Sequence, residues 1–231
     1  MDKGCTALVL PGGGARGAYQ VGVLKAIREI TADAGNPFPV ICGTSAGAIN
    51  AAVLASHAHE FGIGVDRLEQ FWSTMYCARV YRTDMWTVFK SAIQWALSLS
   101  LGGSLFRSPK SLLDNEPLRQ FLEETLQLEG LDRAISSGSL QGLTVTASGY
   151  SCASAISFYQ GQSGIEPWAR ARRHGRPAKI AVKHLMASAA LPFLFPAVQI
   201  GNEYFGSVSF HSPFSPFVNL LSWTSNVPFK L

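Results

Sequence analysis

TALVLPGGGARG, residues 6–17, and FPVICGTSAG, residues 38–47, are two stretches of this chain with the same arrangement of residues. Each begins with a short aliphatic run, residues 6–10 and 38–42, that is typical of a buried strand, and each passes directly into a glycine-containing turn. Between them, apolar side chains recur at helical spacing, which predicts a helix over residues 18–30. A strand, a helix and a second strand in this order predict a parallel sheet with a helix packed on it.

The rest of the chain continues the alternation of helices and strands. Small apolar residues on nearly every face predict a helix over 48–56 that is buried on all sides. Asp66 and Glu69 have capping-box spacing and predict a helix that starts there. The other expected elements are a helix that starts at Asp114 or Asn115 ahead of Pro117, strands over 143–147 and 155–159, a helix over 180–190, and a hairpin of 198–200 with 203–205.

The size and composition fit one globular domain. The chain has 231 residues, of which 47% are hydrophobic and only 15% charged, so it has ample material for a core and does not resemble a disordered protein. No internal repeat or linker divides it. We therefore predict a single α/β domain with a mainly parallel central sheet.

The formal net charge is +4, and the basic residues are scattered except for one cluster. Such a cluster can meet phosphate, either of nucleic acid or of lipid headgroups. We favour a solvated loop between two elements and expect no nucleic-acid partner. The cluster consists of Arg170, Arg172, Arg173, His174, Arg176 and Lys179.

The four cysteines are Cys5, Cys42, Cys77 and Cys152, with no C-x-x-C pair among them. Their wide spacing predicts neither a zinc site nor a disulfide framework. Cys42 lies in a predicted buried strand, where a cysteine acts as a small apolar core residue.

No stretch of the sequence is typical of a membrane or secretion signal. The apolar run 7–10 is too short for a signal peptide. The uncharged stretch 91–106 is short for a bilayer, and proline interrupts the stretch 184–202. We expect a cytoplasmic or peripheral membrane protein without a signal peptide or transmembrane helix.

The first chemical motif is the G-x-S-x-G of residues 43–47, placed between a predicted strand and a predicted buried helix. That is the context of a nucleophile elbow. The flanking glycines allow a sharp turn from which the Ser45 hydroxyl projects, and the following helix N-terminus supplies positive partial charge where an oxyanion would form. We therefore favour Ser45 as a catalytic residue in an elbow made of Gly43, Thr44, Ala46 and Gly47.

The second motif is the glycine loop of residues 12–17, which also follows a strand and opens a helix, so its amides can bind an anion. One interpretation is an oxyanion hole for Ser45, with Arg16 supporting the loop or a headgroup. The other is a G-x-G-x-x-G dinucleotide site, whose acidic residue should end the second strand, whereas Asp33 precedes that strand. The oxyanion loop would consist of Gly12, Gly13, Gly14, Arg16 and Gly17.

These two motifs, G-G-G-x-R-G followed about 30 residues later by G-T-S-A-G, resemble the patatin-like phospholipase family. The resemblance continues through NEPL at 115–118 and ASAALPFLFPAV at 187–198, and covers roughly residues 4–206. It implies a three-layer α/β/α fold and a serine lipid acyl hydrolase that uses a Ser–Asp dyad without metal or organic cofactor. Ser45 would be the nucleophile, and the substrate a phospholipid or another acyl-ester lipid, with peripheral membrane contact.

One part of the family pattern is missing. The dyad aspartate of the family follows the last hairpin, in a Y-x-D-G-G or Y-F-G-D-G pattern, whereas here Tyr204-Phe205-Gly206 is followed by Ser207. A serine hydroxyl is not a general base near neutral pH, so the hydrolase is expected to be impaired. Glu203 would lie about 13 Å from position 207 along a regular strand, and His211 is a second, weak substitute.

The tail, residues 207–231, is rich in serine, phenylalanine and proline, and Lys230 is its only charged residue. We treat residues 1–206 as the family domain and this tail as atypical; a change of reading frame near Gly206 would explain both the tail and the missing aspartate. The apolar segments 86–97 and 191–195 are candidates to receive an acyl chain. The alternative to an impaired hydrolase is a catalytically silent lipid-binding or interaction protein on the same fold.

Overall fold

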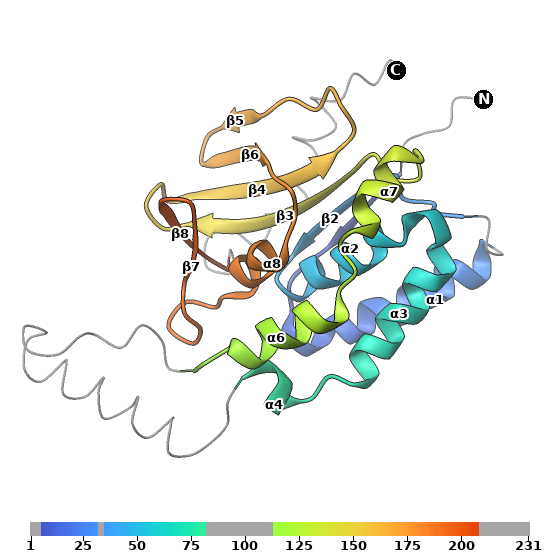
Figure 1. The fold of residues 1–231 in the computed structure, drawn as a ribbon, viewed down its shortest axis with the longest axis horizontal. Coiled ribbons are helices and arrows are strands. Elements are labelled where there is room, and N and C mark those ends of the chain that lie inside the picture. Colours follow the sequence, from blue (N-terminus) through green and yellow to red (C-terminus); the bar gives the residue numbers. More distant parts are fainter. Residues whose placement is uncertain (1–5, 32–34, 82–112, 208–231) are drawn as a thin grey trace, which may run out of the picture.

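The computed structural model describes residues 6–31, 35–81 and 113–207, which form a sheet with helices packed against it (Figure 1). The strand order is β1-β2-β3-β4-β6-β5, with β8 on β3 and β7 on β8. The strands are β1 Ala7–Leu10, β2 Val40–Thr44, β3 Gly142–Gly149, β4 Ser154–Gly161, β5 Trp168–Arg170, β6 Arg173–Pro177, β7 Val198–Ile200 and β8 Glu203–Gly206. The helices are α1 Gly17–Ile30, α2 Ala46–Ser56, α3 Phe61–Ser73, α4 Cys77–Val80, α6 Glu116–Thr125, α7 Gly130–Ser136 and α8 Val182–Ala189, with short 3-10 turns at Gly14–Arg16 and Ala58–Glu60.

The predicted α/β fold with a central sheet and flanking helices is confirmed. Strands β1, β2 and β3 are neighbours and run parallel, and β1 and β2 each end at one of the glycine turns. Strands β4 and β6 also run parallel to each other. The antiparallel pairs are β3 with β4, β5 with β6, β7 with β8, and β8 with β3. The hairpin and the helix predicted over 180–190 form as expected.

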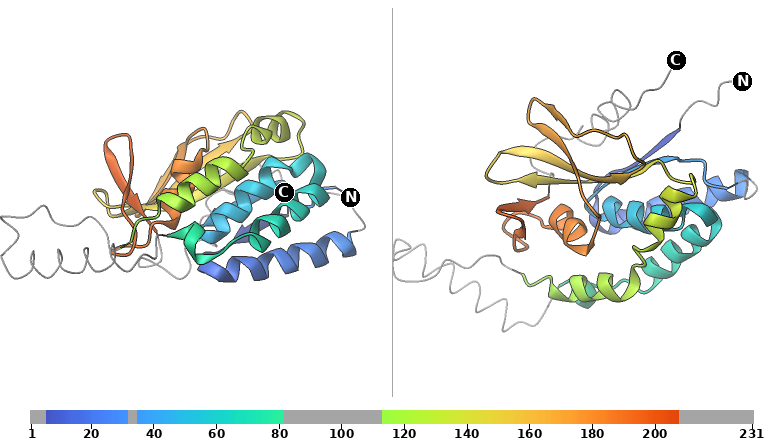
Figure 2. Two further views of the ribbon diagram at one scale, coloured as in Figure 1. Left: turned by 60° about the horizontal axis from the view of Figure 1, so that its bottom comes forward. Right: turned by 45° about the horizontal axis from the view of Figure 1, so that its top comes forward.

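Helix α2 is the centre of the core. Every one of its 11 residues is buried, as its small apolar sequence predicts. It packs on β2 and β3, and α1, α3, α7 and α8 pack around it (Figure 2). Since Ser45 is the N-cap of α2, a fully buried helix directly follows the candidate nucleophile.

The described helices all lie on one face of the sheet (Figure 2). A second helical layer, which the α/β/α arrangement requires, is not among the described residues. The other face carries a smaller apolar cluster of Val40, Cys42, Tyr159 and Trp168. Because Val40 and Cys42 alternate with core-facing Ile41 along β2, this strand is buried on both faces.

Two predicted features are wrong. Asp66 and Glu69 do not cap a helix: α3 begins five residues earlier, at Phe61, and these carboxylates instead form ion pairs with Arg28 and Lys25 of α1, at 2.7 and 2.6 Å. The sequence does not predict this start because the first turn of α3 contains two glycines, which have low helix propensity. One of them, Gly64, packs closely against Leu54 and His57.

The basic cluster is not a loop. Arg170 belongs to β5, and Arg173, His174 and Arg176 belong to β6, with Arg172 in the turn between the strands and Lys179 after them. The two strands pair with each other and extend the sheet beyond β4. The sequence hides this because arginine, histidine and glycine carry no strand signal. Gly175 is required there because the ring of Trp168 lies where its Cβ would be, so the packing of one tryptophan defines the hairpin.

Candidate active site

Ser45 lies in a strained turn between β2 and α2. Its φ is 54° and its ψ is −127°, a conformation that residues other than glycine rarely adopt. The turn is tight enough that a Cβ on Gly43 would lie 2.5 Å from the Ala48 backbone, and a Cβ on Gly47 would collide with the Leu10 carbonyl oxygen. The two glycines of the motif are therefore required by close backbone contacts on both sides of Ser45.

Ser188 of α8 holds this turn from the other side. Its hydroxyl accepts a hydrogen bond from the Ser45 backbone N–H at 2.8 Å and donates one to the Thr146 carbonyl of β3 at 2.6 Å. The Ser188 side chain is fully buried. Ser188 thereby ties the elbow to the middle strand of the sheet and stabilises a backbone conformation that is otherwise unfavourable by about 1–3 kcal/mol.

The glycine loop after β1 lies directly against Ser45. A Cβ built on Gly12 would be 3.0 Å from the Cβ and 3.8 Å from the Oγ of Ser45. Gly14 has a φ of 56°, which favours glycine, and the Arg16 N–H donates to the Gly13 carbonyl at 3.1 Å, closing a 3-10 turn. The structure therefore brings together the two motifs that the sequence places 30 residues apart.

A buried polar network fixes the end of this loop. The Asn50 amide, on α2, donates to the Gly17 carbonyl and to Gln20 Oε1, both at 2.9 Å, and its oxygen accepts from Trp72 Nε1 at 2.7 Å. Gln20 in turn donates to the Pro11 carbonyl at 2.8 Å. Gly17 is needed here because the Trp72 ring occupies the space of a Cβ. The loop is thus anchored at both of its ends.

The sequence analysis assigned no role to Asn50 or Ser188. A signal for Asn50 was present, because it is the one strongly polar side chain within the otherwise apolar segment 48–56. A polar group in a helix buried on all sides needs hydrogen-bond partners. Ser188 gave no such signal, since its contact with Ser45 spans 143 positions of the sequence.

Residue 207 also lies at this site. On the edge of β3 opposite β4, strand β2 ends with Thr44 paired to Thr146, and β8 ends with Gly206 paired to Ser148. The next residue of each strand, Ser45 and Ser207, therefore comes to the level of Ala147 from opposite directions. Ser207 is buried, and its N–H donates to the Ala190 carbonyl at 2.7 Å, two residues after Ser188. Ser207 thus adjoins Ser45 in the register of the sheet.

The contacts of Glu203 do not favour this residue as a substitute base. Its carboxylate forms an ion pair with Arg176 of β6 at 2.7 Å. Hydrogen bonds from Cys152 and then from Arg176 lower the pKa of Glu203, whereas a general base is favoured by a pKa closer to neutrality. His211 and the apolar segment 86–97 lie outside the described residues. Residues 191–195 are described, and Phe193 is 69% exposed there.

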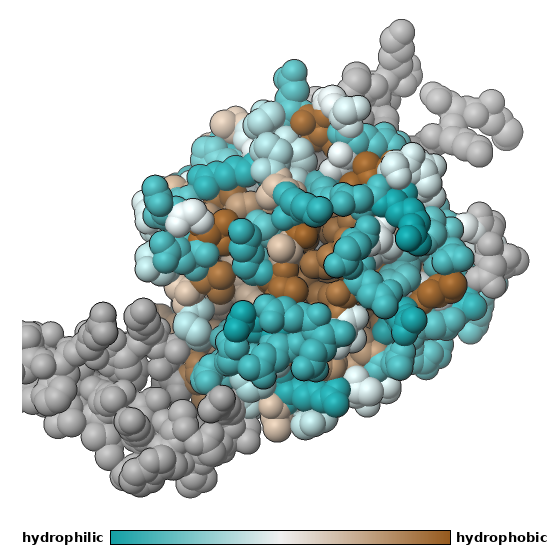
Figure 3. All heavy atoms as spheres, viewed as in Figure 1, coloured by the Kyte–Doolittle hydropathy of each residue, from teal (hydrophilic) through white to brown (hydrophobic). Residues whose placement is uncertain are grey.

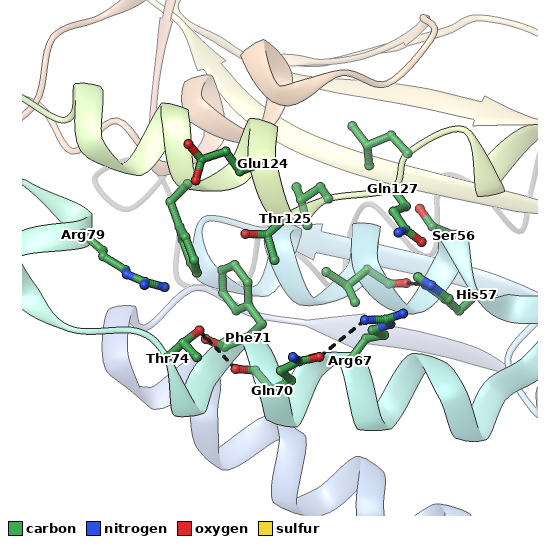
Figure 4. Close-up of a pocket in the computed structure, with 14 residues that line it drawn as sticks. Ser56, His57, Arg67, Gln70, Phe71, Thr74, Arg79, Glu124, Thr125 and Gln127 are labelled. Atoms are coloured by element: carbon green, nitrogen blue, oxygen red, sulfur yellow. Dashed lines mark hydrogen bonds between the residues drawn. The ribbon is translucent and has the colours of Figure 1, made fainter.

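A separate cavity of about 320 Å³ lies between α3 and α6, with the end of α2 at its floor (Figure 4). Arg79 and His57 lie at its two ends, with Phe71 and Thr125 between them. The residues of α2 that line this cavity are Val53 and Ser56, which follow Ser45 by about 12 and 16 Å along the helix axis. Figure 3 shows apolar side chains in the hollowed centre of the same face, ringed by polar ones. This cavity is not part of the Ser45 site.

A serine held at a strained strand-to-helix turn, with a glycine loop against it, is the architecture of an α/β protein with a hydrolase-type elbow. A match to the family described as Patatin-like phospholipase extends over residues 8–218. The chain therefore belongs to the patatin-like phospholipase family.

Individual relatives match over shorter stretches. Lysophospholipase nte1 of Aspergillus terreus is 57% identical over 51 residues, which are 22% of this chain and 3% of that protein. The cUMP-AMP-activated phospholipase of Escherichia coli is 42% identical over 76 residues, 31% of this chain and 21% of that protein. The chain thus spans a small part of the length of these relatives.

The crystal structure of VipD from Legionella pneumophila aligns with 90% of this chain and 47% of its own, at 12% identity and a TM-score of 0.48. Within the described residues, the structure contains no helix that is both long and apolar enough to cross a bilayer.

Proposed function

We propose that this chain is a lipid acyl hydrolase of the phospholipase type with Ser45 as its nucleophile and the glycine loop as its oxyanion hole. The observation that carries the proposal is the strained conformation of Ser45 at the N-terminus of α2, with Gly12 against its side chain. Such strain persists only where the surrounding structure holds it, and it concentrates at functional sites. The family of the chain and the names of its relatives support a phospholipid ester as substrate.

In the proposed reaction, Ser45 Oγ attacks the carbonyl carbon of the ester, and its proton passes through a base to the leaving alcohol. The product is an acyl-serine and a lipid that lacks one acyl chain. Water then attacks the acyl-serine and releases the fatty acid, restoring the hydroxyl. The amides of Gly13 and Gly14 stabilise the negative oxygen of both tetrahedral intermediates, together with the positive end of α2.

The proton transfer is the weak step in this chain. The position that adjoins Ser45, where the family carries its aspartate, holds Ser207. A positioned general base contributes about 10²–10⁴-fold to the rate of such a reaction. We therefore propose that the chain is impaired by about this factor and retains the contribution of its oxyanion loop.

The second proposal is a lipid-binding protein on the same fold without catalysis. The observation in its favour is again Ser207, since no described carboxylate other than the ion-paired Glu203 is found on the β7–β8 hairpin. The two proposals differ only in whether Ser45 turns over substrate.

The test is hydrolysis of a short-chain chromogenic ester and of a phospholipid by the parent chain and by Ser45→Ala. Ser56→Ala, at the end of the helix that follows Ser45, is the control because it removes a buried serine hydroxyl away from the candidate site. A hydrolase loses its activity in Ser45→Ala and keeps it in Ser56→Ala. Equal activity in the parent and in Ser45→Ala would refute Ser45 as the nucleophile, and lipid binding without turnover in the parent would support the second proposal.

A further inference from the structure

The hairpin of β5 and β6 ends in a turn of three arginines, Arg170, Arg172 and Arg173, which we call the arginine turn. Arg170 and Arg173 are paired across the two strands, and Arg172 lies at the tip with a φ of 58°. Arg170 and Arg172 are exposed and Arg173 is half-buried. The turn therefore presents three guanidinium groups close together on the surface.

Arg172 and Arg173 differ from their basic neighbours in their partners. Arg176 pairs with Glu203 at 2.7 Å, and Lys179 pairs with Asp132 at 3.3 Å. Neither Arg172 nor Arg173 forms an ion pair with any carboxylate of the described residues. Within the part of the chain that the structure describes, two positive charges at one point of the surface thus have no carboxylate partner, and an external anion can approach them.

The register of the sheet places this turn at the same edge as the candidate active site. Arg173 pairs with Ala155 of β4, and Ala155 pairs with Ser148 of β3. Ser45 reaches the level of Ala147, so Arg173 lies one residue, about 3.3 Å, further out along the strands. Three strand spacings of about 4.8 Å separate the lines of β2 and β6, which gives a lateral separation of about 14 Å. Figure 1 shows the β5–β6 turn at the same end of the sheet as the β7–β8 hairpin.

The same edge also exposes large apolar side chains. Phe193 and Leu194, which follow α8 and its Ser188, are 69% and 41% exposed. Tyr150, at the end of β3, is 42% exposed, and Tyr19, in the first turn of α1 after the glycine loop, is 78% exposed. Exposed aromatic side chains and the arginine turn at the same end of the sheet give this end one apolar and one cationic component. A bilayer surface offers both counterparts.

We propose that the arginine turn docks this edge of the molecule on an anionic phospholipid bilayer. Arginine binds phosphate oxygens in a bidentate manner, and the exposed aromatic and aliphatic side chains insert at the level of the headgroups. In this orientation Ser45 faces the bilayer that holds its ester. This inference rests on the proposed function, because it names the bilayer as the surface that carries the substrate of the proposed hydrolase. The docking itself requires no hydrolysis and can be measured without it.

The test is the sedimentation of Ser45→Ala with vesicles of phosphatidylcholine, with and without phosphatidylserine, so that the lipid stays intact whatever the activity of the parent. The chain is expected to bind the anionic vesicles and to leave the neutral ones unbound. Arg172→Gln with Arg173→Gln should weaken the binding about 30-fold, at about fivefold per arginine. Raising the salt from about 0.1 M to about 1 M should release the bound chain.

The matched control is Arg67→Gln with Arg133→Gln, which removes the same charge from exposed arginines of α3 and α7. An equal loss of binding in both double variants would overturn the proposal, because net charge alone would then explain it. No binding to anionic vesicles, or tighter binding to a nucleic-acid duplex than to vesicles, would also overturn it. Unchanged melting temperatures in both double variants establish that the fold is intact.

Discussion

Ser188→Ala tests whether one buried hydroxyl holds the elbow in its strained conformation. The substitution removes both hydrogen bonds of the Ser188 hydroxyl, to the Ser45 N–H at 2.8 Å and to the Thr146 carbonyl at 2.6 Å. An N–H left without its partner costs about 1–3 kcal/mol, and the second lost bond about 0.5–1.5 kcal/mol. Alanine fits the fully buried site, so no steric term is added. The sum predicts a loss of about 1.5–4.5 kcal/mol in the free energy of unfolding.

The assay is urea unfolding of the parent, Ser188→Ala and Ser56→Ala, with the slope of the transition unchanged. Ser56 is the matched control because its hydroxyl is equally buried but donates only to the Ala52 carbonyl within α2, at 2.8 Å. Its replacement by alanine should cost less than about 1 kcal/mol, since alanine favours the helix. Equal losses in the two variants would refute the special role of Ser188, as would a loss below about 1 kcal/mol.

Three further predictions concern the core around this site. The Cβ of Gly47→Ala would collide with the main chain of β1, so this substitution should lower the free energy of unfolding by about 1–3 kcal/mol. Gly22→Ala, in open space on α1, should raise the free energy of unfolding by up to about 1 kcal/mol. Urea unfolding midpoints compare the two variants, and an unchanged midpoint for Gly47→Ala would contradict this packing. Burial and then Lys183 lower the pKa of His184 to about 4, so the unfolded chain binds the proton more tightly and stability falls as the pH drops from about 6.5 toward 4. The free energy of unfolding at pH 7 should exceed that at pH 5 by at most about 2 kcal/mol through this residue. His184→Gln should remove that difference. Burial raises the pKa of the Cys42 thiol to about 12, so iodoacetamide should modify exposed Cys77 in the native protein and leave Cys42 unmodified. Mass spectrometry detects the labelled residues, and label on Cys42 would contradict this prediction.

The parts of the fold that the sequence predicts are those set by local pattern. The aliphatic runs before the two glycine turns become β1 and β2, because each run is short, apolar and ended by glycine. Segment 48–56 becomes a fully buried helix because its side chains are small on every face. The start of α6 is also set locally, since the Asp114 carboxylate accepts the Glu116 N–H at 2.9 Å.

The features that the sequence does not predict depend on contacts between distant residues. The arginine-rich strands β5 and β6 form because β4 offers a free edge and Trp168 packs on Gly175, neither of which a local pattern shows. Asp66 has the spacing of a cap but is used for an ion pair with α1. For the candidate site, Ser45 and Gly12 are expected from their motifs, whereas their contact with each other is set by strand order.

The proximity of position 207 to Ser45 also comes from topology. The sequence motif leads us to expect an aspartate at position 207, but only the two registers on β3 show that β8 ends where β2 ends. This geometry gives the central claim a direct form. We propose that the chain has the scaffold of a serine hydrolase, with Ser45 as nucleophile, and that it lacks the base at position 207.

The measurement that tests this claim most directly is ester hydrolysis by Ser207→Asp, beside Ser207→Asn and the double variant Ser45→Ala with Ser207→Asp. Asparagine has nearly the same shape as aspartate but is not a base, so it separates chemistry from packing. We predict that Ser207→Asp raises kcat/KM about 10²–10⁴-fold over the parent, that Ser207→Asn does not, and that the double variant is inactive. If Ser207→Asp folds with the melting temperature of Ser207→Asn and hydrolyses ester no faster than the parent, then position 207 is not the missing part and the account is wrong.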